Sequence, residues 1–496
     1  MSAHFPALIV VSPLMAAMVV AILAWVRPGA CLPLAVVTLA GSLWAAAGML
    51  WRVVVSGPFA YHLGNWPPPI GIAYQIDHLN ALVLTAMAAV ALVNLLATWR
   101  HARRDFAERV NYFYALYLLF CAGTYGIIVT GDAFNLFVLL EITSISGYAL
   151  VGMGKRDAAL ASLNYIFMGT IGASFYLLGV GYLYLVTGTL NMADLAMILP
   201  RLYGNKVVTA AFIIAMTGLF MKMALFPLHG WLPNAYSESS SPVRSLIAPL
   251  TTKTMVYVMV RVALYVFPVD FSFGHLAFAQ PAVWLAVTSI VAASLMALSQ
   301  TSLKRMLAYV LIAEVGYMVG GFWLGNRMGM TGAILHIVND AAMTLCAFLA
   351  VGSLRQQLAD DSFKALRGAF RRMPWTMAVL VVAGLSMIGV PPTCGFFSKW
   401  YLIGGALAAG QWAFVGALIF SSLINAVLFF RIFEIGFFEP FAASDHGHPP
   451  DLAYAEAPAT VIAPMLVTAA GLVVLGLLTG RIVTRIIDAA IPAAIL

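Results

Sequence analysis

Long apolar runs recur along the whole chain and constrain its fold more than any other feature. A helix needs roughly 20 apolar residues to cross a bilayer core of about 30 Å, and many runs reach that length. Of the 496 residues, 62% are hydrophobic and only 9% are charged, a composition that no soluble globular domain shares. We predict an all-α integral membrane protein with about fourteen transmembrane helices, which begin near residues 6, 31, 78, 111, 133, 160, 207, 242, 281, 304, 328, 374, 411 and 459.

The lysine and arginine residues predict the orientation of this helical protein. In a soluble protein the net charge of +7 would suggest a nucleic-acid partner, but basic loops of a membrane protein mark its cytoplasmic side. If the N-terminus is outside, four basic segments lie on the cytoplasmic side: WRHARRDFAER (99–109), Lys155-Arg156, Lys304-Arg305 and the loop from Arg355 to Arg372. No basic segment precedes the first apolar run, so we interpret it as a retained helix and not a signal peptide. We therefore predict a multi-pass protein of the cell inner (plasma) membrane, with its N-terminus outside and no nucleic-acid partner.

Cofactor chemistry has no visible signature in the sequence. Cys31, Cys121, Cys346 and Cys394 lie in apolar runs without the paired spacing of a disulfide, metal or iron–sulfur site. The sequence has no dinucleotide-binding glycine fingerprint, no P-loop and no HExxH motif. We expect no cofactor, no metal and no catalytic residue in this chain. It would then be a transporter subunit, which could still serve a redox-driven complex.

Ionisable residues inside apolar runs are the strongest functional signal. A charge at the centre of a membrane helix costs roughly 2.5 to 3.5 kcal/mol on insertion scales, so it normally faces a protein interior or a water-filled path. Glu141 and Lys222 lie at similar depths in their predicted helices. A carboxylate and an ammonium at matched depth neutralise each other, so the protonation of one depends on the other. The two residues form either a gate for protons or a static ion pair.

More buried ionisable residues favour a proton path. Lys253 has no carboxylate nearby in the sequence, and an unpaired buried lysine relieves its cost by releasing its proton, which makes it a relay candidate. Further titratable groups follow in later helices: Glu314, His336, Asp340 and Lys399. His336 and Asp340 are four residues apart, so we expect them to share one helix face. Arg261 does not release its proton in practice, and we expect it to be structural.

Two predicted helices carry prolines close to a buried lysine. Lys222 precedes Pro227 in KMALFPLHGWLP, while Lys399 follows Pro391 and Pro392 in GVPPTCGFFSKW. A lysine before the break in one half and after it in the other is what an inverted-topology repeat would give, and such interrupted segments point to a transport path. Interrupted backbone at membrane depth is tolerated only within protein or beside water. The prolines therefore indicate a hydrated interior.

Four runs of the sequence resemble one family of membrane subunits. They are TGDAFNLFVLLEITSISGYAL (130–150), MKMALFPLHGWLPNAYSESSSPVRSLIAPLTTKTMVYVMVR (221–261), SLKRMLAYVLIAEVGY (302–317) and GLSMIGVPPTCGFFSKWYL (384–402). The runs resemble the proton-conducting, antiporter-like subunits. That family joins the D subunit of Mrp-type sodium/proton antiporters to the large proton-pumping subunits of respiratory NADH:quinone oxidoreductase and membrane-bound hydrogenases. The similarity spans about residues 70 to 440, and the sequence looks most like the Mrp D subunit.

The resemblance implies an architecture and a set of roles. It implies fourteen helices, with helices 7 and 12 discontinuous. The implied regions are an N-terminal three-helix part (1–110), two inverted five-helix repeats (111–267 and 281–438), and a connection with the C-terminal helix (439–496). Glu141 and Lys222 match the family's modulating glutamate and lysine, Lys253 its central relay lysine, and Lys399 the residue that closes the path.

The sequence departs from the family pattern at three positions. Glu314 stands where relatives more often have glutamine or histidine. Asp340 replaces a usual histidine, and Thr344 stands where Mrp-like relatives often have lysine. These changes make the second half more acidic. A carboxylate can still relay protons if burial favours its protonated form, but an acidic cavity could equally prefer sodium.

We expect a proton-translocating subunit of a multi-subunit cation (Na⁺)/proton antiporter, with other membrane subunits and the lipid bilayer as partners. One alternative is the proton-pumping subunit of a redox-driven complex. Another is a non-conducting scaffold, against which Glu141, Lys222, Lys253 and Lys399 argue together. A third is a module that loads another solute, such as an inorganic carbon species, driven by proton flow.

Overall fold

Helices dominate the structure, a computed structural model that describes residues 4–154, 157–358, 361–438 and 454–495. The long helices are α1 (Phe5–Val26), α2 (Cys31–Ser56), α3 (His78–Phe106), α4 (Val110–Val129), α5 (Ala133–Gly152), α6 (Ala158–Thr187), α8 (Lys206–Lys222), α10 (Ser241–Arg261), α11 (Ala279–Leu298), α12 (Leu303–Trp323), α13 (Arg327–Leu358), α15 (Pro374–Ile388), α16 (Cys394–Ala408), α17 (Trp412–Phe437) and α18 (Ala459–Ile482). The short ones are α7 (Met192–Ile198), α9 (Trp231–Glu238), α14 (Ala369–Arg372) and α19 (Asp488–Ala490). Lys155 and Arg156, which contributed to the predicted orientation, and residues 439–453 of the predicted C-terminal region lie outside the described residues.

The predicted all-α membrane fold is confirmed. Each predicted helix start lies within two residues of an observed start. Within the described residues, eleven spans are long and apolar enough to cross a membrane, and one of them, His78–Val129, comprises both α3 and α4. The helices α8, α15 and α16 are shorter because the helical backbone is interrupted there: α8 ends at Lys222, α15 ends at Ile388, and α16 begins at Cys394. The exact number of crossings and the two inverted repeats stay predictions.

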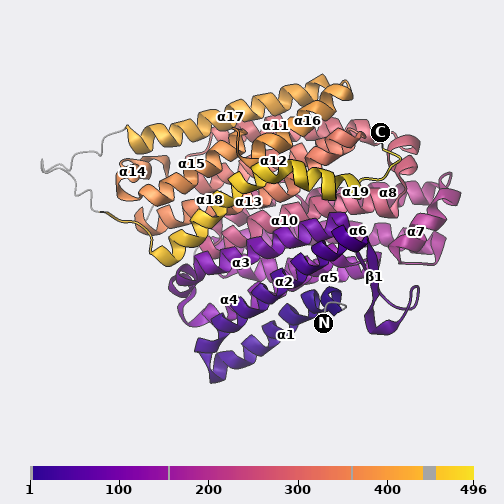
Figure 1. Ribbon diagram of the computed structural model, residues 1–496, viewed down its shortest axis with the longest axis horizontal. Coiled ribbons are helices and arrows are strands. Elements are labelled where there is room, and N and C mark those ends of the chain that lie inside the picture. The colour runs from indigo at the N-terminus through magenta and orange to yellow at the C-terminus, as the bar shows by residue number, and fades with distance from the viewer. Residues whose placement is uncertain (1–3, 155–156, 359–360, 439–453, 496) are drawn as a thin grey trace, which may run out of the picture.

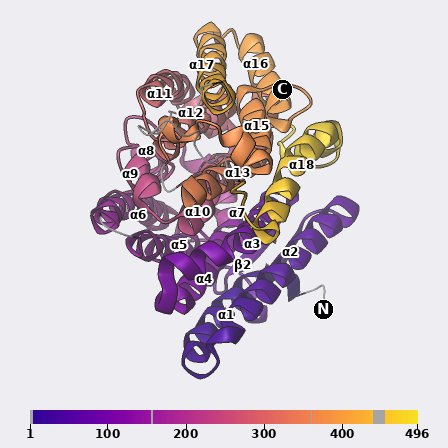
Figure 2. The same ribbon diagram turned by 90° about the vertical axis from the view of Figure 1, so that its left-hand side faces the viewer.

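The helices run side by side, and the most buried of them lie at the centre (Figure 1, Figure 2). In α10, α12 and α13, 94% of the apolar stretch is buried, against 33% in α1. Figure 2 accordingly places α10 and α13 inside the bundle and α1 at its edge. Both termini lie toward the end that carries β1 and α7, opposite α14 (Figure 1). The centre of the bundle is therefore the part shielded from lipid by the chain itself.

A small antiparallel ribbon departs from the all-α prediction. β1 (Phe59–His62) pairs with β2 (Ala73–Ile76) in the connection between α2 and α3, with Phe59 opposite Ile76. Strands of four residues are too short to give a clear alternating pattern in the sequence. The ribbon leads into Asp77, whose carboxylate accepts a hydrogen bond from the backbone N–H of Asn80 and caps α3.

Asp77 also forms an ion pair with Arg261, at the end of α10. Only 4% of the arginine side chain and 15% of the aspartate side chain are exposed. The ring of Tyr265 lies 4.4 Å from the guanidinium carbon, a cation–π contact. These contacts join the start of α3 to the end of α10, and they agree with the prediction that Arg261 is structural.

Small residues bring α6 and α8 close together and so position the end of α8. A β-carbon at Gly218 would lie 2.4 Å from the carbonyl oxygen of Gly172, and a β-carbon at Gly172 would lie 3.0 Å from Cγ of Lys222. Glycines allow helix backbones to approach in this way in membrane proteins. The contact fixes the position of Lys222 against α6.

Replacing Gly218 with alanine is therefore expected to weaken the packing of α6 on α8. The added methyl group meets backbone atoms that cannot rotate away, and such overpacking typically costs about 1 to 3 kcal/mol. Gly181→Ala, in α6, is the matched control, because nothing in the described structure lies within 4 Å of its β-carbon position. The thermal stability of the two purified variants in detergent checks this. Equal stability would contradict the close approach.

Candidate functional site

Glu141 and Lys222 lie close to each other beside the break in the seventh predicted helix. Lys222 is the last residue of α8, α9 begins at Trp231, and Pro227 lies between them. The Lys222 ammonium donates to the Ser144 hydroxyl at 2.6 Å and lies 3.8 Å from Oε1 of Glu141. Lys222 is 7% exposed and the Glu141 side chain 27%. The predicted pair is thus near the limit of ion-pair distance, with Ser144 as the closer partner of the ammonium.

A small cavity lies beside Lys222, between α4, α5, α6 and α10. The volume in which the centre of a water molecule can lie is about 20 Å³, which is enough for one water. Its polar lining includes Ser144, Thr251 and Thr254. Among the described residues, the hydroxyls of Thr251 and Thr254 have no hydrogen-bond partner. The cavity therefore provides unused hydroxyls between Lys222 and the turn of α10 that carries Lys253.

Lys253 is fully buried and paired, which corrects the prediction that it has no acidic partner. Its ammonium lies 2.9 Å from Oδ2 of Asp340, a residue of α13. It also donates to the Thr344 hydroxyl at 3.1 Å and to the carbonyl oxygen of Ala248 at 3.3 Å. The sequence did not reveal the pair because its members belong to helices far apart in the chain.

His336 pairs with Glu314 of α12. Its Nε2 lies 2.5 Å from Oε2 of Glu314, and its Nδ1 lies 2.8 Å from the hydroxyl of Ser398 in α16. His336 and Asp340 both belong to α13, one turn apart, but their side chains contact different neighbours. Asp340 reaches α10, whereas His336 lies between α12 and α16. The site therefore contains separate pairs and not one continuous His336 and Asp340 cluster.

Lys399 follows the second break, at the side of α16. Pro391 and Pro392 lie between the end of α15 at Ile388 and the start of α16 at Cys394. The Lys399 ammonium donates to the carbonyl oxygens of Met387 at 2.6 Å and Ile388 at 3.4 Å. The last carbonyls of a helix lack partners within it and carry partial negative charge. The break thus supplies acceptors for a lysine that forms no ion pair among the described residues.

Two further groups hold Lys399. Its ammonium donates to the Ser422 hydroxyl at 3.2 Å and lies 5.0 Å from the centre of the Tyr317 ring. Tyr317 is fully buried, and its hydroxyl donates to Ser421 at 2.7 Å. Four of the residues that contact the path lysines and His336 were not predicted from the sequence: Ser144, Ser398, Ser422 and Tyr317. A hydroxyl or aromatic residue in a membrane helix is usually a packing residue, and no local pattern distinguishes these four.

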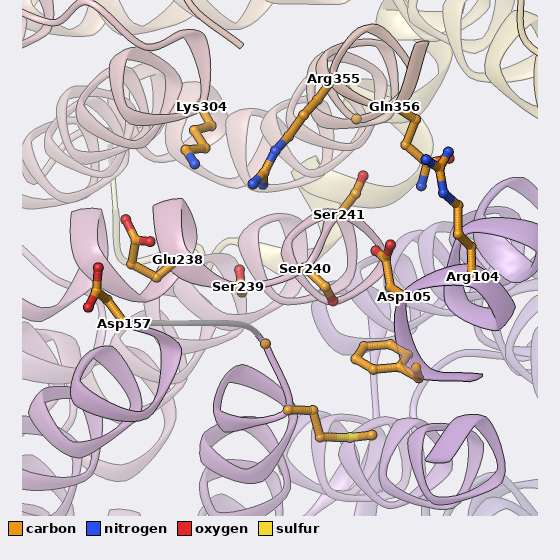
Figure 3. Close-up of a pocket in the computed structure, with 14 residues that line it drawn as sticks. Arg104, Asp105, Asp157, Glu238, Ser239, Ser240, Ser241, Lys304, Arg355 and Gln356 are labelled. Atoms are coloured by element: carbon orange, nitrogen blue, oxygen red, sulfur yellow. The ribbon is translucent and has the colours of Figure 1, made fainter. Parts of the chain in front are cut away.

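A polar vestibule of about 630 Å³ opens at one end of α10. Figure 3 shows Lys304 of α12 and Arg355 of α13 projecting into the vestibule from one side, across from Glu238 of α9 and Ser239, with Asp157 further to the side of Glu238. Arg104 and Asp105 of α3 approach from the opposite side (Figure 3). In the sequence, several of these charges indicated orientation only. The structure gathers them where α9, which follows Lys222, meets α10, which carries Lys253.

No group of three or more His, Cys, Asp or Glu side chains in the described ranges is placed to hold a metal ion. Asp340 and Glu314 each have a basic partner at 2.9 Å or less. The more acidic second half therefore contains ion pairs and not an open carboxylate cluster.

Comparisons with known proteins place this geometry in a family. A family model described as NADH:quinone oxidoreductase/Mrp antiporter, transmembrane, matches residues 130–425, which include every predicted path residue from Glu141 to Lys399. The chain belongs to this family. The NADH:quinone oxidoreductase/Mrp antiporter family was also the one that the sequence motifs resembled, so that prediction is confirmed.

Two curated relatives represent both branches of the family. A protein named as the N subunit of NADH-quinone oxidoreductase, from Desulforudis audaxviator, is 41% identical over 99% of both chains. A protein named as the D subunit of a Na(+)/H(+) antiporter, from Alkalihalophilus pseudofirmus, is 30% identical over 80% of both chains.

Two solved structures share the fold. The membrane-bound sulfane sulfur reductase, an archaeal respiratory membrane complex, contains a chain with a TM-score of 0.89 and 32% identity; the match covers 98% of the present chain and 97% of the other. The Mrp complex from Dietzia sp. contains a chain with a TM-score of 0.88 and 24% identity; the match covers 99% of the present chain and 96% of the other. Both solved relatives are parts of complexes, as their names state.

Proposed function

We propose that the chain is a proton-translocating subunit of a multi-subunit complex in the cell inner membrane. The observation that carries the proposal is the series of buried ionisable groups in the middle of the bundle, from α5 and α8 through α10 and α13 to α12 and α16. Charges so deep in a membrane protein normally mark a path for ions or protons. Most of these groups touch a partner that can exchange a proton with them.

In this proposal Lys222 and Glu141 form the first gate. When Glu141 is close, it stabilises the protonated ammonium; when it withdraws, the proton is driven toward Lys253. The unused hydroxyls of Thr251 and Thr254, with one water in the small cavity, would bridge the two lysines. The proton would then pass to the second half and leave near Lys399.

The vestibule is the proposed mouth of the first half-channel. It is large enough to hold many water molecules, and Asp157 and Glu238 are carboxylates able to collect protons there. Lys304 and Arg355 also line it, and basic residues at helix ends favour the cytoplasmic side. We therefore propose that the vestibule faces the cytoplasm. The N-terminus, which lies toward the other end of the bundle (Figure 1), would then be outside.

Two drivers are compatible with the same proton path. An antiporter is supported by the relative named as the D subunit of a Na(+)/H(+) antiporter, and it would couple proton flow to sodium exchange. A redox driver is favoured by the 41% identity, over 99% of the chain, to a relative named as the N subunit of NADH-quinone oxidoreductase. In either case the driver resides in other subunits, because the ionisable groups described here only accept and release protons.

Purification of the tagged chain from its native membrane, with mass spectrometry of the co-purifying proteins, separates the two drivers. Small hydrophobic subunits with sodium-dependent proton flux are the result expected of an antiporter. Iron–sulfur, flavin or nickel proteins are expected of a redox complex. A purified complex that moves no protons under either driver would contradict the proposed function and favour the alternative of a non-conducting scaffold.

A further inference from the structure

The contact of Lys253 with Asp340 joins the two halves of the proposed path directly. Lys253 belongs to α10 and Asp340 to α13, the two helices at the centre of the bundle (Figure 2). Both side chains are fully buried. Oδ2 of Asp340 lies 2.9 Å from the ammonium nitrogen, and in the described structure it accepts no hydrogen bond. The nitrogen and this oxygen are therefore close enough for direct proton transfer once an N–H of the ammonium turns toward Oδ2.

Thr344 contacts both members of the pair. Its hydroxyl accepts a hydrogen bond from the Lys253 ammonium at 3.1 Å and donates one to Oδ1 of Asp340 at 2.9 Å. Thr344 is itself fully buried. The hydroxyl thereby holds one carboxylate oxygen and leaves the other facing the ammonium.

The hydrogen bonds of Thr344 differ from those of comparable threonines in this chain. Thr124 and Thr143 donate to the backbone carbonyl four residues earlier in their own helices, at 2.8 and 2.9 Å. That is the ordinary way for a buried helical threonine to satisfy its hydroxyl. Thr344 donates instead to the side chain of the residue four positions earlier, Asp340. Its hydroxyl is therefore committed to the ion pair and not to its own backbone.

We propose that Thr344 is a positioning residue that sets Lys253 and Asp340 as a direct proton contact between the two halves. The inference rests on the proposed function, since it concerns how protons move. In the step, an N–H bond of the Lys253 ammonium breaks and an O–H bond forms at Oδ2 of Asp340. A neutral amine and a neutral carboxylic acid remain, so two buried charges disappear together and no further reactant is needed.

The neutral acid then releases its proton into the second half, and Lys253 is ready to accept another from the direction of Lys222. Thr344 acts twice in this cycle. Its hydroxyl keeps Oδ1 of Asp340 occupied, and its oxygen orients the ammonium toward Oδ2. Without the hydroxyl the two groups are free to turn away from each other.

The test uses the native complex purified through this chain and reconstituted in vesicles, with Thr344→Val and Thr344→Ser compared. Valine keeps the volume of threonine but lacks the hydroxyl, whereas serine keeps the hydroxyl. We expect Thr344→Val to lower proton flux roughly tenfold, the effect of losing one hydrogen bond to a charged group, and Thr344→Ser to retain most of it. Subunit composition and thermal stability show whether each variant assembles.

Infrared difference spectra of the same samples provide a readout that a structural role would not change. A band from a protonated carboxyl group should appear during turnover and vanish in Asp340→Asn. In Thr344→Val it should shift, because the hydroxyl no longer bonds to that carboxyl group. Normal flux in Thr344→Val, or equal losses in both Thr344 variants with an unshifted band, would overturn this inference alone. A wild-type complex whose driver works without proton flux would remove the proposed function and this inference with it.

Discussion

Replacing Lys222 with alanine is expected to reduce proton flux to background while the protein still assembles. Lys222 is the basic member of the proposed first gate and lines a cavity together with Thr251 and Thr254, which belong to the turn of α10 that contains Lys253. Alanine cannot carry a proton, and the cavity hydroxyls alone have no ammonium from which to receive one. The measurement is the initial rate of proton flux in vesicles that contain the native complex, with equal amounts of the chain in each sample.

Lys206→Ala is the matched control for this variant. Lys206 begins the same helix, α8, and is exposed. We expect it to leave proton flux unchanged, because its side chain has no contact with the proposed path. Substantial flux in a stably assembled Lys222→Ala variant would contradict the role of Lys222, and equal losses in both variants would point to a defect of the helix as a whole.

Removal of the charge of Asp77 is expected to cost about 3 to 5 kcal/mol of stability, because it leaves the buried guanidinium of Arg261 without its partner. Asp77→Asn suits this purpose. Asparagine can still accept the hydrogen bond from Asn80 N–H that caps α3, so the loss reports the ion pair and not the cap. Chemical or thermal unfolding of the purified chain in detergent measures the change.

Two further variants sharpen this test. Arg261→Met combined with Asp77→Asn removes both charges and should recover much of the stability, since no charge is left unpaired. Asp488→Asn breaks a half-exposed pair with Arg327, at 3.5 Å, and should cost less than about 1 kcal/mol. Equal effects of Asp77→Asn and Asp488→Asn would show that the buried pair does not join α3 to α10 as the structure suggests.

Much of the fold was predictable because the bilayer imposes a strong and local requirement. A run of about 20 apolar residues is visible in the sequence, and α1 to α6 begin almost where the runs do. The breaks near Pro227 and Pro391 were visible for the same reason, since proline lacks the N–H that a helix needs. The β1–β2 ribbon escaped prediction because its strands are only four residues long.

The candidate site was predictable in its members but not in its pairing. A lysine or carboxylate in an apolar run is conspicuous, so Lys253 and Asp340 were both identified from the sequence. Their contact depends on how α10 packs against α13, and no local pattern encodes that. The prediction that Lys253 is unpaired was wrong for this reason. The carbonyl acceptors of Lys399 were missed because every residue has a carbonyl, and only the break in the helix frees those of Met387 and Ile388.

The departures from the family pattern gain a physical meaning from the structure. Asp340 and Thr344, two of the departures that the resemblance indicated, together contact Lys253. Glu314, the third departure, contacts His336. Each added acid is therefore matched by a base from another helix, and the acidity of the second half is neutralised within the protein. This arrangement favours proton relay over a preformed sodium site.

The central claim is that this chain carries protons from Lys222 through Lys253 to Lys399. The most direct test is the number of protons moved by the reconstituted native complex under its own driver, compared between the wild type and the double variant Lys253→Met with Asp340→Asn. The double variant removes the relay without leaving either charge unpaired. The account predicts that the double variant assembles and moves no protons. An assembled double variant that moves as many protons as the wild type would contradict it.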